Sequence, residues 1–325
     1  MERTISAAKI KIGQIVGREK ILALSVVIIL FAVLAISNPS SFLSSYNIGT
    51  LLDYATTYFV AAIGLTFVIL IGSIDLSLGG MLSLFTVVFT LALNRFGYIA
   101  YPLVLSLGLG CGLLNGVVFT RLKIPSFIGT FGTAGLYQSL ALVVSGGRPI
   151  GLNIASVHKL DVLNFELGVL KGIHILGALL FFVFWVIQSY FPFGRYVMAV
   201  GSSERAVYLS GVKVNRVKNL AFAISGFSAA CAAIVLVARM LSGDPTIGMS
   251  YQLPVIATVV VGGNALTGGI GGIFNTLLGT FVVVLVGNGL NVIGVDVYYQ
   301  TIVTGIIAMI AVALTLDKSK VKIVK

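Results

Sequence analysis

Long apolar runs separated by short polar segments make up nearly the whole sequence. Each run is about 20 residues long, the length that an α-helix needs to cross the hydrocarbon core of a bilayer. A transmembrane barrel would instead show apolar and polar residues in alternation. The pattern predicts an all-α polytopic membrane protein with ten spans, at 21–37, 49–71, 76–94, 99–119, 125–145, 172–191, 217–240, 251–267, 273–293 and 298–316.

The composition agrees with this class. The 325 residues are 58% hydrophobic and 10% charged, and the mean hydropathy is +1.08. A soluble domain of this length needs a larger polar surface, so we expect one transmembrane domain over residues 1–325. Five spans before and five after the polar segment at 146–171 suit two inverted five-helix repeats, because an odd number of crossings reverses the second half. Sequence identity between the two halves is not apparent.

Lysine and arginine are unevenly distributed between the two sides of the predicted bundle. With the N-terminus in the cytoplasm, the cytoplasmic segments hold five at 1–20, two at 121–123, five at 195–218 and four at 318–325. The bias follows the positive-inside rule and places both termini in the cytoplasm. The net charge of +11 is therefore a topology signal, and we expect no nucleic-acid partner. The external segments hold Arg95, Arg148, Lys159, Lys171 and Arg239.

Two spans allow a second interpretation. The basic segment 1–20 followed by an apolar run has the form of a signal peptide, but an uncleaved first helix better suits a chain with many later spans. Span 251–267 contains Pro254 and precedes glycine-rich sequence, so it is either a re-entrant or broken helix or a full crossing. A full crossing keeps the four C-terminal lysines in the cytoplasm, and we prefer it for that reason.

Two connections are long enough to carry structure. The external segment 146–171 mixes polar and apolar residues and suits a short structured surface. The cytoplasmic segment 192–216 contains "SSERAVYLSG", which has the form of a short helix with Ser202 or Ser203 as N-cap, Glu204 and Arg205 in its first turn, and Gly211 after its end. Such a helix suits docking of a partner protein; a basic loop lying on anionic lipid headgroups is the alternative.

The sequence contains none of the motifs that we associate with enzyme or nucleotide sites. "GLGLGCG" lacks the strand–turn–helix setting of a dinucleotide site, and no glycine-rich stretch ends in Gly-Lys-Ser/Thr. His158 and His174 have no metal-ligand spacing, and we interpret them as structural. Cys111 and Cys231 lie in different apolar runs and are interpreted as small core residues. We therefore expect no catalytic residues, no metal and no cofactor.

Polar side chains inside the spans are costly in lipid and should face the bundle interior, a pore or a subunit interface. Asp53, Asp75, Asn115, Asn264, Asn288 and Asn291 are the candidates. Amides around a polar cavity suit the passage of an uncharged, hydroxyl-rich solute, for which we name Asn115, Asn264, Asn288 and Asn291. Hydrogen bonding between helices is an equally good interpretation.

The stretch "LIGSIDLSLGG" at 70–80 places Asp75 between two long apolar runs. The predicted topology puts it at the cytoplasmic junction of the second and third spans, where Asp75 or Ser77 is expected to cap the third span. Gly79 and Gly80 allow that turn to pack closely. Glycines also recur at 108, 112 and 116 and at 129, 132 and 135, which predicts close helix contacts in the fourth and fifth spans.

Several stretches together resemble the permease subunits of bacterial ABC importers for simple sugars, the ribose/xylose/arabinose-type family. "AAIGLTFVILIGSIDLSLGGMLSL" (61–84) is similar to the Gly-Gly-Ile-Asp-Leu-Ser-Val-Gly region of the family, and "FGRYVMAVGSSERAVYLSGVKVNRVK" (193–218) to its cytoplasmic loop. "VVVGGNALTGGIGGIFNTLLG" (259–279) and "NGLNVIGVDVYYQTIVTG" (288–305) resemble later blocks. The chain departs from the pattern at Ser73, Ser203, Gln252 and Pro254, and the last two replace acidic residues.

The resemblance implies a dimeric permease of the bacterial cytoplasmic membrane, with a second copy or a paralogue as the other half. Its partners would be an ATP-binding cassette subunit, commonly with two nucleotide-binding domains in one chain, and an extracytoplasmic solute-binding protein. The cytoplasmic helix would be the coupling helix, with Ser203, Glu204, Arg205, Ala206, Leu209 and Gly211 as its residues. A pentose-like sugar is the implied solute. Import of branched-chain amino acids or nucleosides, and an ion-coupled secondary transporter, remain alternatives.

Overall fold

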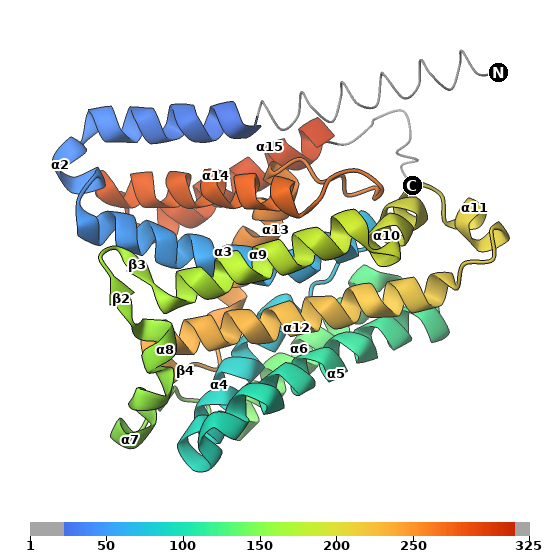
Figure 1. Cartoon of the computed structure of the whole chain (residues 1–325), viewed down its shortest axis with the longest axis horizontal. Coiled ribbons are helices and arrows are strands. Elements are labelled where there is room, and N and C mark those ends of the chain that lie inside the picture. The colour runs from blue at the N-terminus through green and yellow to red at the C-terminus, as the bar shows by residue number, and fades with distance from the viewer. Residues whose placement is uncertain (1–22, 316–325) are drawn as a thin grey trace.

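The computed structural model describes residues 23–315, which form a bundle of long helices (Figure 1). The predicted cytoplasmic segment 1–20 and the C-terminal lysines lie outside these residues. The long helices are Ala23–Ser37, α3 (Ser45–Leu70), α4 (Leu78–Phe96), α5 (Ala100–Arg121), α6 (Ser126–Ser145), α9 (Gly172–Tyr190), α12 (Val214–Met240), α13 (Ile247–Val261), α14 (Ile273–Val292) and α15 (Val297–Thr315).

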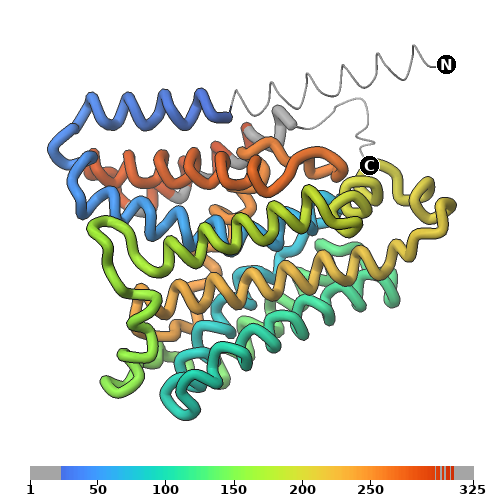
Figure 2. Tube along the Cα trace, viewed as in Figure 1, coloured from blue at the N-terminus to red at the C-terminus, as the bar shows by residue number. Residues whose placement is uncertain are grey.

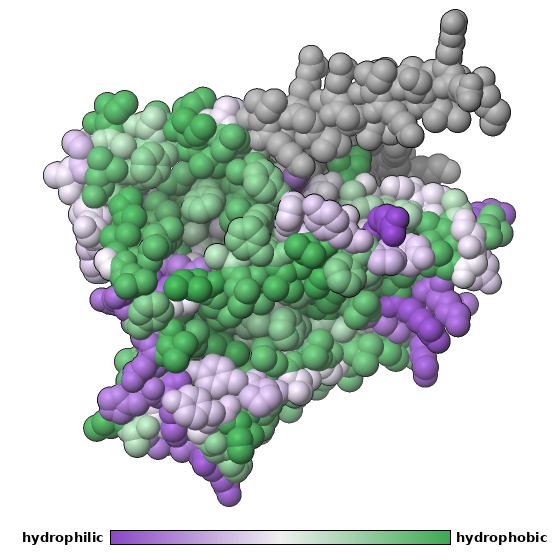
Figure 3. Space-filling model, viewed as in Figure 1, coloured by the Kyte–Doolittle hydropathy of each residue, from purple (hydrophilic) through white to green (hydrophobic). Residues whose placement is uncertain are grey.

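The helical class is confirmed, and each predicted span overlaps one of these helices. Within the described residues, six stretches are long and apolar enough to cross a membrane, with α4 and α5 joined into one stretch through the 3-10 turn η1 (Gly97–Ile99). The helices Ala23–Ser37 and α13 are shorter. The number of ten crossings therefore stays a prediction. Figure 3 shows apolar side chains over the middle of one face and hydrophilic ones towards its two ends, as a membrane belt requires.

The two most buried long helices are α3 and α12, and α12 lies along both α5 and α3 (Figure 2). Glycine allows this close approach. A Cβ on Gly226 of α12 would overlap the backbone of Gly108 of α5, and one on Gly112 would overlap Phe222. Close packing of α5 through its glycines is thus confirmed. For α6 the same prediction holds at Gly129, where a Cβ would lie 3.2 Å from the Val118 side chain of α5, and is wrong within this chain for Gly132 and Gly135, where no atom lies within 4 Å.

Both long connections carry structure. In the one predicted to be external, β1 (Ile150–Gly151) pairs with β4 (Ser242–Gly243), and β2 (Glu166–Leu167) pairs with β3 (Leu170–Lys171). The short helices α7 (Ile154–Val157) and α8 (Asp161–Asn164), with the 3-10 turn η2 (His158–Leu160) between them, complete the predicted structured surface. It lies, with α2 (Pro39–Phe42), at the end of the bundle opposite α10 and α11 (Figure 1).

The connection predicted to be cytoplasmic differs from the expected loop with one short helix. Residues 192–216 form two helices, α10 (Pro192–Ser202) and α11 (Glu204–Leu209). Proline occupies the first turn of α10, where its missing N–H costs nothing. Val197 and Val200 of α10 are buried in the apolar cluster that contains Phe67 of α3 and Phe184 of α9. The burial of these valines holds α10 against the bundle and fixes the position of α11.

Two helices begin after a short segment outside regular structure, and they occupy corresponding places in the two halves. Residues 73–77 precede α4, the third predicted span, and 244–246 precede α13, the eighth. In both segments an aspartate accepts hydrogen bonds from the backbone N–H and the hydroxyl of the residue two positions on: Ser77 to Asp75 at 2.9 and 2.6 Å, and Thr246 to Asp244 at 2.7 and 2.8 Å.

Three pairs of positions are separated by the same number of residues along the chain: Asp75 and Asp244, Gly79 and Gly248, and the starts of α3 and α12. Gly79 and Gly248 contact each other reciprocally, each backbone carbonyl lying against the other Cα. A short Asp-x-Ser/Thr-x-Gly repeat thus stands where the predicted inverted repeats place equivalent residues. The repeat is too short to be recognised from the sequence alone; it becomes apparent once the structure shows that both copies lie at the start of a helix.

The 251–267 span is shorter than predicted. Its helix, α13, ends at Val261 with Pro254 inside it, and a turn-rich loop then leads to α14. Gly263, Gly268, Gly269 and Gly271 of that loop have positive φ, which glycine alone adopts freely. The Gly269 N–H donates to the Leu70 carbonyl at 2.9 Å, so the loop lies beside the end of α3.

The α5–α12 contact predicts that Gly226→Ala destabilises the protein by about 1–3 kcal/mol, because the added methyl group meets backbone atoms that cannot move aside. Gly110→Ala is the matched control on α5: no atom lies within 4 Å of its Cβ, and alanine favours the helix. Thermal unfolding of detergent-purified protein gives the melting temperature of each variant. Equal melting temperatures for the two variants would contradict the close contact.

Candidate functional site

The extended segment before α4 satisfies its backbone with hydroxyl groups from α6. The N–H of Ile74 donates to Ser126 Oγ at 3.2 Å, and the N–H of Leu76 donates to Thr130 Oγ1 at 2.9 Å. Buried backbone groups outside regular structure need such partners. These two serine and threonine side chains therefore make an unwound segment tolerable inside an apolar bundle.

Asp75 is fully buried and joins α4 to α12. Its Oδ1 accepts from the Ser77 N–H and hydroxyl, and its Oδ2 accepts from Ser225 Oγ at 2.8 Å. Within the described part of the chain, no basic side chain forms a salt bridge with Asp75. Three hydrogen bonds are thus its only compensation for the loss of water.

Asp75 lies between the second and third predicted spans, as expected, but it is fully buried and does not lie at the surface end of that junction. Ser225 contacts both Asp75 and Gly64, so Asp75 lies about two helical turns inside the end of α3. The segment turns back into the bundle because hydroxyl groups of α6 and α12 are available to it there. Ser77 is the N-cap residue of α4, but its side chain makes no cap bond; the Asp75 carboxylate accepts from the Ser77 N–H instead.

Asn115 belongs to the same network. Its amide donates to Ser77 Oγ at 2.7 Å, and its carbonyl oxygen accepts from the Tyr137 hydroxyl at 3.3 Å. Asp75, Ser77, Asn115 and Tyr137 thereby connect α4, α5 and α6. Gly80 lies against the backbone of Ala134, and Gly79 against Gly248 and Gln252, so both glycines of the motif are at close helix contacts.

The other three asparagines proposed for a passage lie elsewhere. Asn264 donates to the Val259 carbonyl and to Thr276 Oγ1 and accepts from the Gly272 N–H, which folds the loop before α14. Asn288 exchanges two hydrogen bonds with Asn47, at 3.1 and 2.8 Å. Asn291 is exposed. The four amides do not line a common cavity.

An ionic cluster that the sequence did not reveal lies at the opposite end from α11. Asp53 of α3 accepts from Lys171 Nζ and pairs with His174 Nε2, both at 3.0 Å, and Arg239 Nε lies 3.9 Å away. The N–H of Lys171 donates to His174 Nδ1, so Nε2 carries the proton directed at Asp53. The cluster lines a pocket of about 620 Å³. The sequence placed Lys171 and Arg239 on one side and marked Asp53 as a polar residue in a span, but it did not pair them, because the partners come from β3, α9 and α12.

The α11 segment has the predicted form. The N-cap Ser203 Oγ accepts from the Ala206 N–H at 3.4 Å, Glu204 and Arg205 begin the helix, and Gly211 has φ +81° after its end. Glu204 is held by Lys218 of α12, whose Nζ lies 2.8 Å from both carboxylate oxygens.

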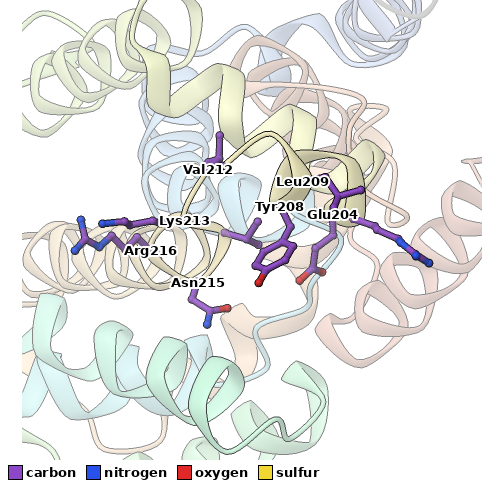
Figure 4. A pocket seen from close by; sticks show the side chains of 10 residues that line it. Glu204, Tyr208, Leu209, Val212, Lys213, Asn215 and Arg216 are labelled. Atoms are coloured by element: carbon purple, nitrogen blue, oxygen red, sulfur yellow. The ribbon is translucent and has the colours of Figure 1, made fainter.

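The exposed side of α11 borders a concavity of about 1090 Å³ (Figure 4). Lys213 and Arg216 lie at one side of it and Glu204 and Leu209 at the other. Tyr208 and Leu209 are 70% and 76% exposed, whereas Val207 is buried. The arrangement is a rigid, partly apolar, basic surface that suits a protein partner.

Within the described residues, no group of three or more His, Cys, Asp or Glu side chains can hold a metal ion. His158 is exposed and pairs with Asp161. Cys111 and Cys231 are free thiols.

Comparison with known proteins gives one family match and many relatives. The family described as "Branched-chain amino acid transport system / permease component" matches residues 47–312. The ribose import permease protein of Bacillus subtilis is 38% identical over 90% of this chain and 91% of that protein. That of Haemophilus influenzae is 36% identical over 88% and 89%. The L-arabinose transport system permease protein of Escherichia coli is 30% identical over 95% and 94%. No solved structure matches the chain.

The Asp75 network predicts different effects for two substitutions. Asp75→Ala leaves the Ser77 N–H and the Ser77 and Ser225 hydroxyls without their acceptor, at about 1–3 kcal/mol for each group that stays unpaired. Asp75→Asn keeps one acceptor oxygen and adds a donor that Ser225 Oγ can accept. Thermal unfolding in detergent should therefore rank the variants wild type, Asn, Ala. An alanine variant as stable as the asparagine variant would exclude the network as a structural element.

Proposed function

The chain belongs to the family of ABC-importer permeases that includes the ribose and arabinose import permeases, and from this premise we propose that it moves a pentose-like sugar or related small solute into the cytoplasm. The observation that carries the proposal is identity of 36–38% to ribose import permeases over about nine-tenths of the chain. Import of branched-chain amino acids is the second candidate, because the family description names them.

The chain itself carries out no catalysis in this proposal, and ATP hydrolysis belongs to a separate ATPase subunit with two nucleotide-binding domains. That subunit docks on α11 and the basic surface beside it. Three features support this role. Tyr208 and Leu209 are exposed and offer apolar anchors to a partner. Val207 is buried against the bundle, and Glu204 forms a salt bridge with Lys218. The coupling residues are those named from the sequence, together with Tyr208.

Motion would pass from α11 to the bundle through α12. Lys218 belongs to α12, which also holds Asp75 through Ser225 and packs closely on α5. When the ATPase closes on ATP, a pull on α11 therefore tilts α12 together with the buried network. Tilting of this kind gives alternating access of one internal site to the two sides of the membrane.

The remaining partners follow from the same premise. An extracytoplasmic binding protein delivers the solute to the end formed by β1–β4, α7, α8 and the Asp53 pocket, where Ile154 and Val162 are 87% and 78% exposed. A second permease copy or a paralogue completes the membrane unit in a bacterial cytoplasmic membrane, with both termini in the cytoplasm and the single domain crossing it ten times. Lipid covers the remaining apolar surface.

The function is tested by uptake into proteoliposomes that contain this chain, its ATPase and its binding protein. ATP-dependent uptake of labelled ribose, arabinose or xylose, with no uptake of labelled leucine, is the expected result. Leucine uptake would favour the second candidate. Uptake by this chain alone, driven by an ion gradient, would replace the proposal with a secondary transporter.

The docking role of α11 predicts that Tyr208→Ala together with Leu209→Ala weakens ATPase binding about tenfold or more, because two exposed anchors are removed from a small interface. Tyr46→Ala is the matched control: Tyr46 is 86% exposed at the opposite end of the bundle. Co-purification of the ATPase and solute uptake are the measurements. Wild-type ATPase binding by the double variant would exclude α11 as the docking element.

A further inference from the structure

The loop between α13 and α14 lies at the same end of the bundle as α10 and α11 (Figure 1). It covers residues 262–272, "GGNALTGGIGG", and we call it the glycine loop. The role proposed above for α11 does not include this loop. Its shape, its neighbours and its exposed side chains nevertheless relate it to the same partner.

The glycine loop is held in one shape by hydrogen bonds. Buried Asn264 accepts from the Gly272 N–H and so ties the two ends of the loop together. Within the loop, the Ala265 N–H donates to the Ile270 carbonyl at 3.1 Å, and the Gly268 N–H donates to the Ala265 carbonyl at 2.9 Å. A loop with this many internal bonds presents a fixed surface to a partner, which reduces the entropy lost on binding.

Gln188 of α9 fixes the loop from the side. Its Oε1 accepts from the Ile273 N–H at 2.8 Å, and its Nε2 donates to the Gly271 carbonyl at 3.4 Å. The N–H groups of Gly272 and Ile273 at the start of α14 are therefore taken by amide side chains of the chain itself. In glycine loops that bind phosphate, such groups point at the ligand instead, so this loop is not built as an anion site.

The loop lies directly beside the start of α11. A Cβ on Gly268 would lie 2.9 Å from the Cα of Gly201 in α10, and a Cβ on Gly269 would overlap Ser202. Ser202 is followed by Ser203, the N-cap residue of α11. Backbone contact thus joins the glycine loop to the connection between α10 and α11, and the two surfaces are continuous.

The two large apolar side chains of the loop differ in exposure. Leu266 packs against the main apolar cluster of the bundle and anchors the loop there. Ile270 is 47% exposed, and Thr267 is exposed as well. A single exposed isoleucine is ordinary on a protein surface. This one stands on a fixed backbone beside the helix that is proposed to bind the ATPase.

The size of α11 also requires a second contact. The helix has six residues, whereas a stable protein–protein interface buries about 800 Å² on each partner, which takes roughly 20–30 residues. Residues 204–216, which form α11 and the concavity beside it, are too few to supply that area. A bound ATPase must therefore cover adjoining surface, and the glycine loop adjoins α11.

We propose that the glycine loop is a second docking element for the ATPase subunit, continuous with α11, and that Ile270 is its apolar anchor. The proposal rests on the transport function proposed above and extends the ATPase-binding surface from one segment of the chain to two.

This contact gives the ATPase a second point of action on the bundle. A Cβ on Gly262 at the end of α13 would overlap the backbone of Asn275 in α14, and one on Gly279 of α14 would overlap that of Thr258 in α13. The two helices are therefore closely packed on either side of the loop. Through α11 the ATPase acts on α12, and through the glycine loop it acts on α13 and α14 together.

Cysteine protection tests the contact in the full-length permease in lipid nanodiscs. Ile270→Cys should react with a water-soluble maleimide, and saturating ATPase should slow the reaction at least about tenfold, because the core of an interface excludes water. Peptide mass spectrometry reads the label at this position separately from the native cysteines. Ile293→Cys is the control: Ile293 is 62% exposed at the other end of α14 and should react equally with and without ATPase.

Ser210→Cys separates failure of this proposal from failure of the proposed function. Ser210 is exposed at the end of α11, and its thiol should be protected by the ATPase. Protection of the Ser210 position with an unprotected Ile270 position would overturn the loop contact alone. If neither is protected, the ATPase does not dock at this end, and both proposals fail. An Ile270 position that is unreactive before ATPase is added would show that lipid or the second copy covers the loop, which also overturns the contact.

Ile270→Ser tests the anchor without a label. Loss of one apolar anchor should weaken ATPase binding about tenfold and lower solute uptake, while the melting temperature of the permease stays unchanged. Ile293→Ser is the matched control and should bind the ATPase as the wild type does. Wild-type ATPase affinity and uptake in Ile270→Ser would overturn the role of Ile270.

Discussion

The Asp75 carboxylate is the point on which the arrangement of four helices depends. Through Ser77, Ser225 and Asn115 it connects the start of α4 with α12 and α5, and Asn115 passes the network to Tyr137 of α6. An aspartate in an apolar bundle is stable only where several donors converge on it. That requirement fixes how far α4 enters the bundle and therefore which residues of α4 face α13.

The position of α4 brings the two halves of the chain together. Gly79 and Gly248 can meet only because neither carries a side chain, and their contact sets the register between α4 and segment 243–252. This register aligns Ser83 and Thr86 with their backbone partners, the Gly248 N–H and the Asp244 carbonyl.

The two ends of the bundle have different chemistry. At one end, α11 is braced by the Glu204–Lys218 pair and presents Tyr208 and Leu209 outward. At the other, the charges of Asp53, Lys171 and Arg239 join α3, β3 and α12 beside an open pocket. Because α12 carries both Lys218 and Arg239, one helix connects the two ends with the buried network between them. That connection is the physical basis of the coupling that we propose between the two ends of the bundle.

The sequence by itself determined the helical class, the approximate position of every long helix, a helix cap at Ser202 or Ser203, and the close contact of α5 through Gly108 and Gly112. These follow from hydrophobic runs, capping residues and glycine spacing, which are local properties of the chain. The amphipathic α10 was missed because its apolar side is short and lies in a basic segment.

Only the tertiary structure decided which polar groups meet. Asp75 lies inside the bundle because hydroxyl groups of α6 and α12 are there to receive the segment that carries it, and Asp53 is paired by side chains more than 100 residues away. The four asparagines share a residue type but no common site. Hydrogen-bond partners depend on helix register and packing between distant segments, and a single sequence does not record these.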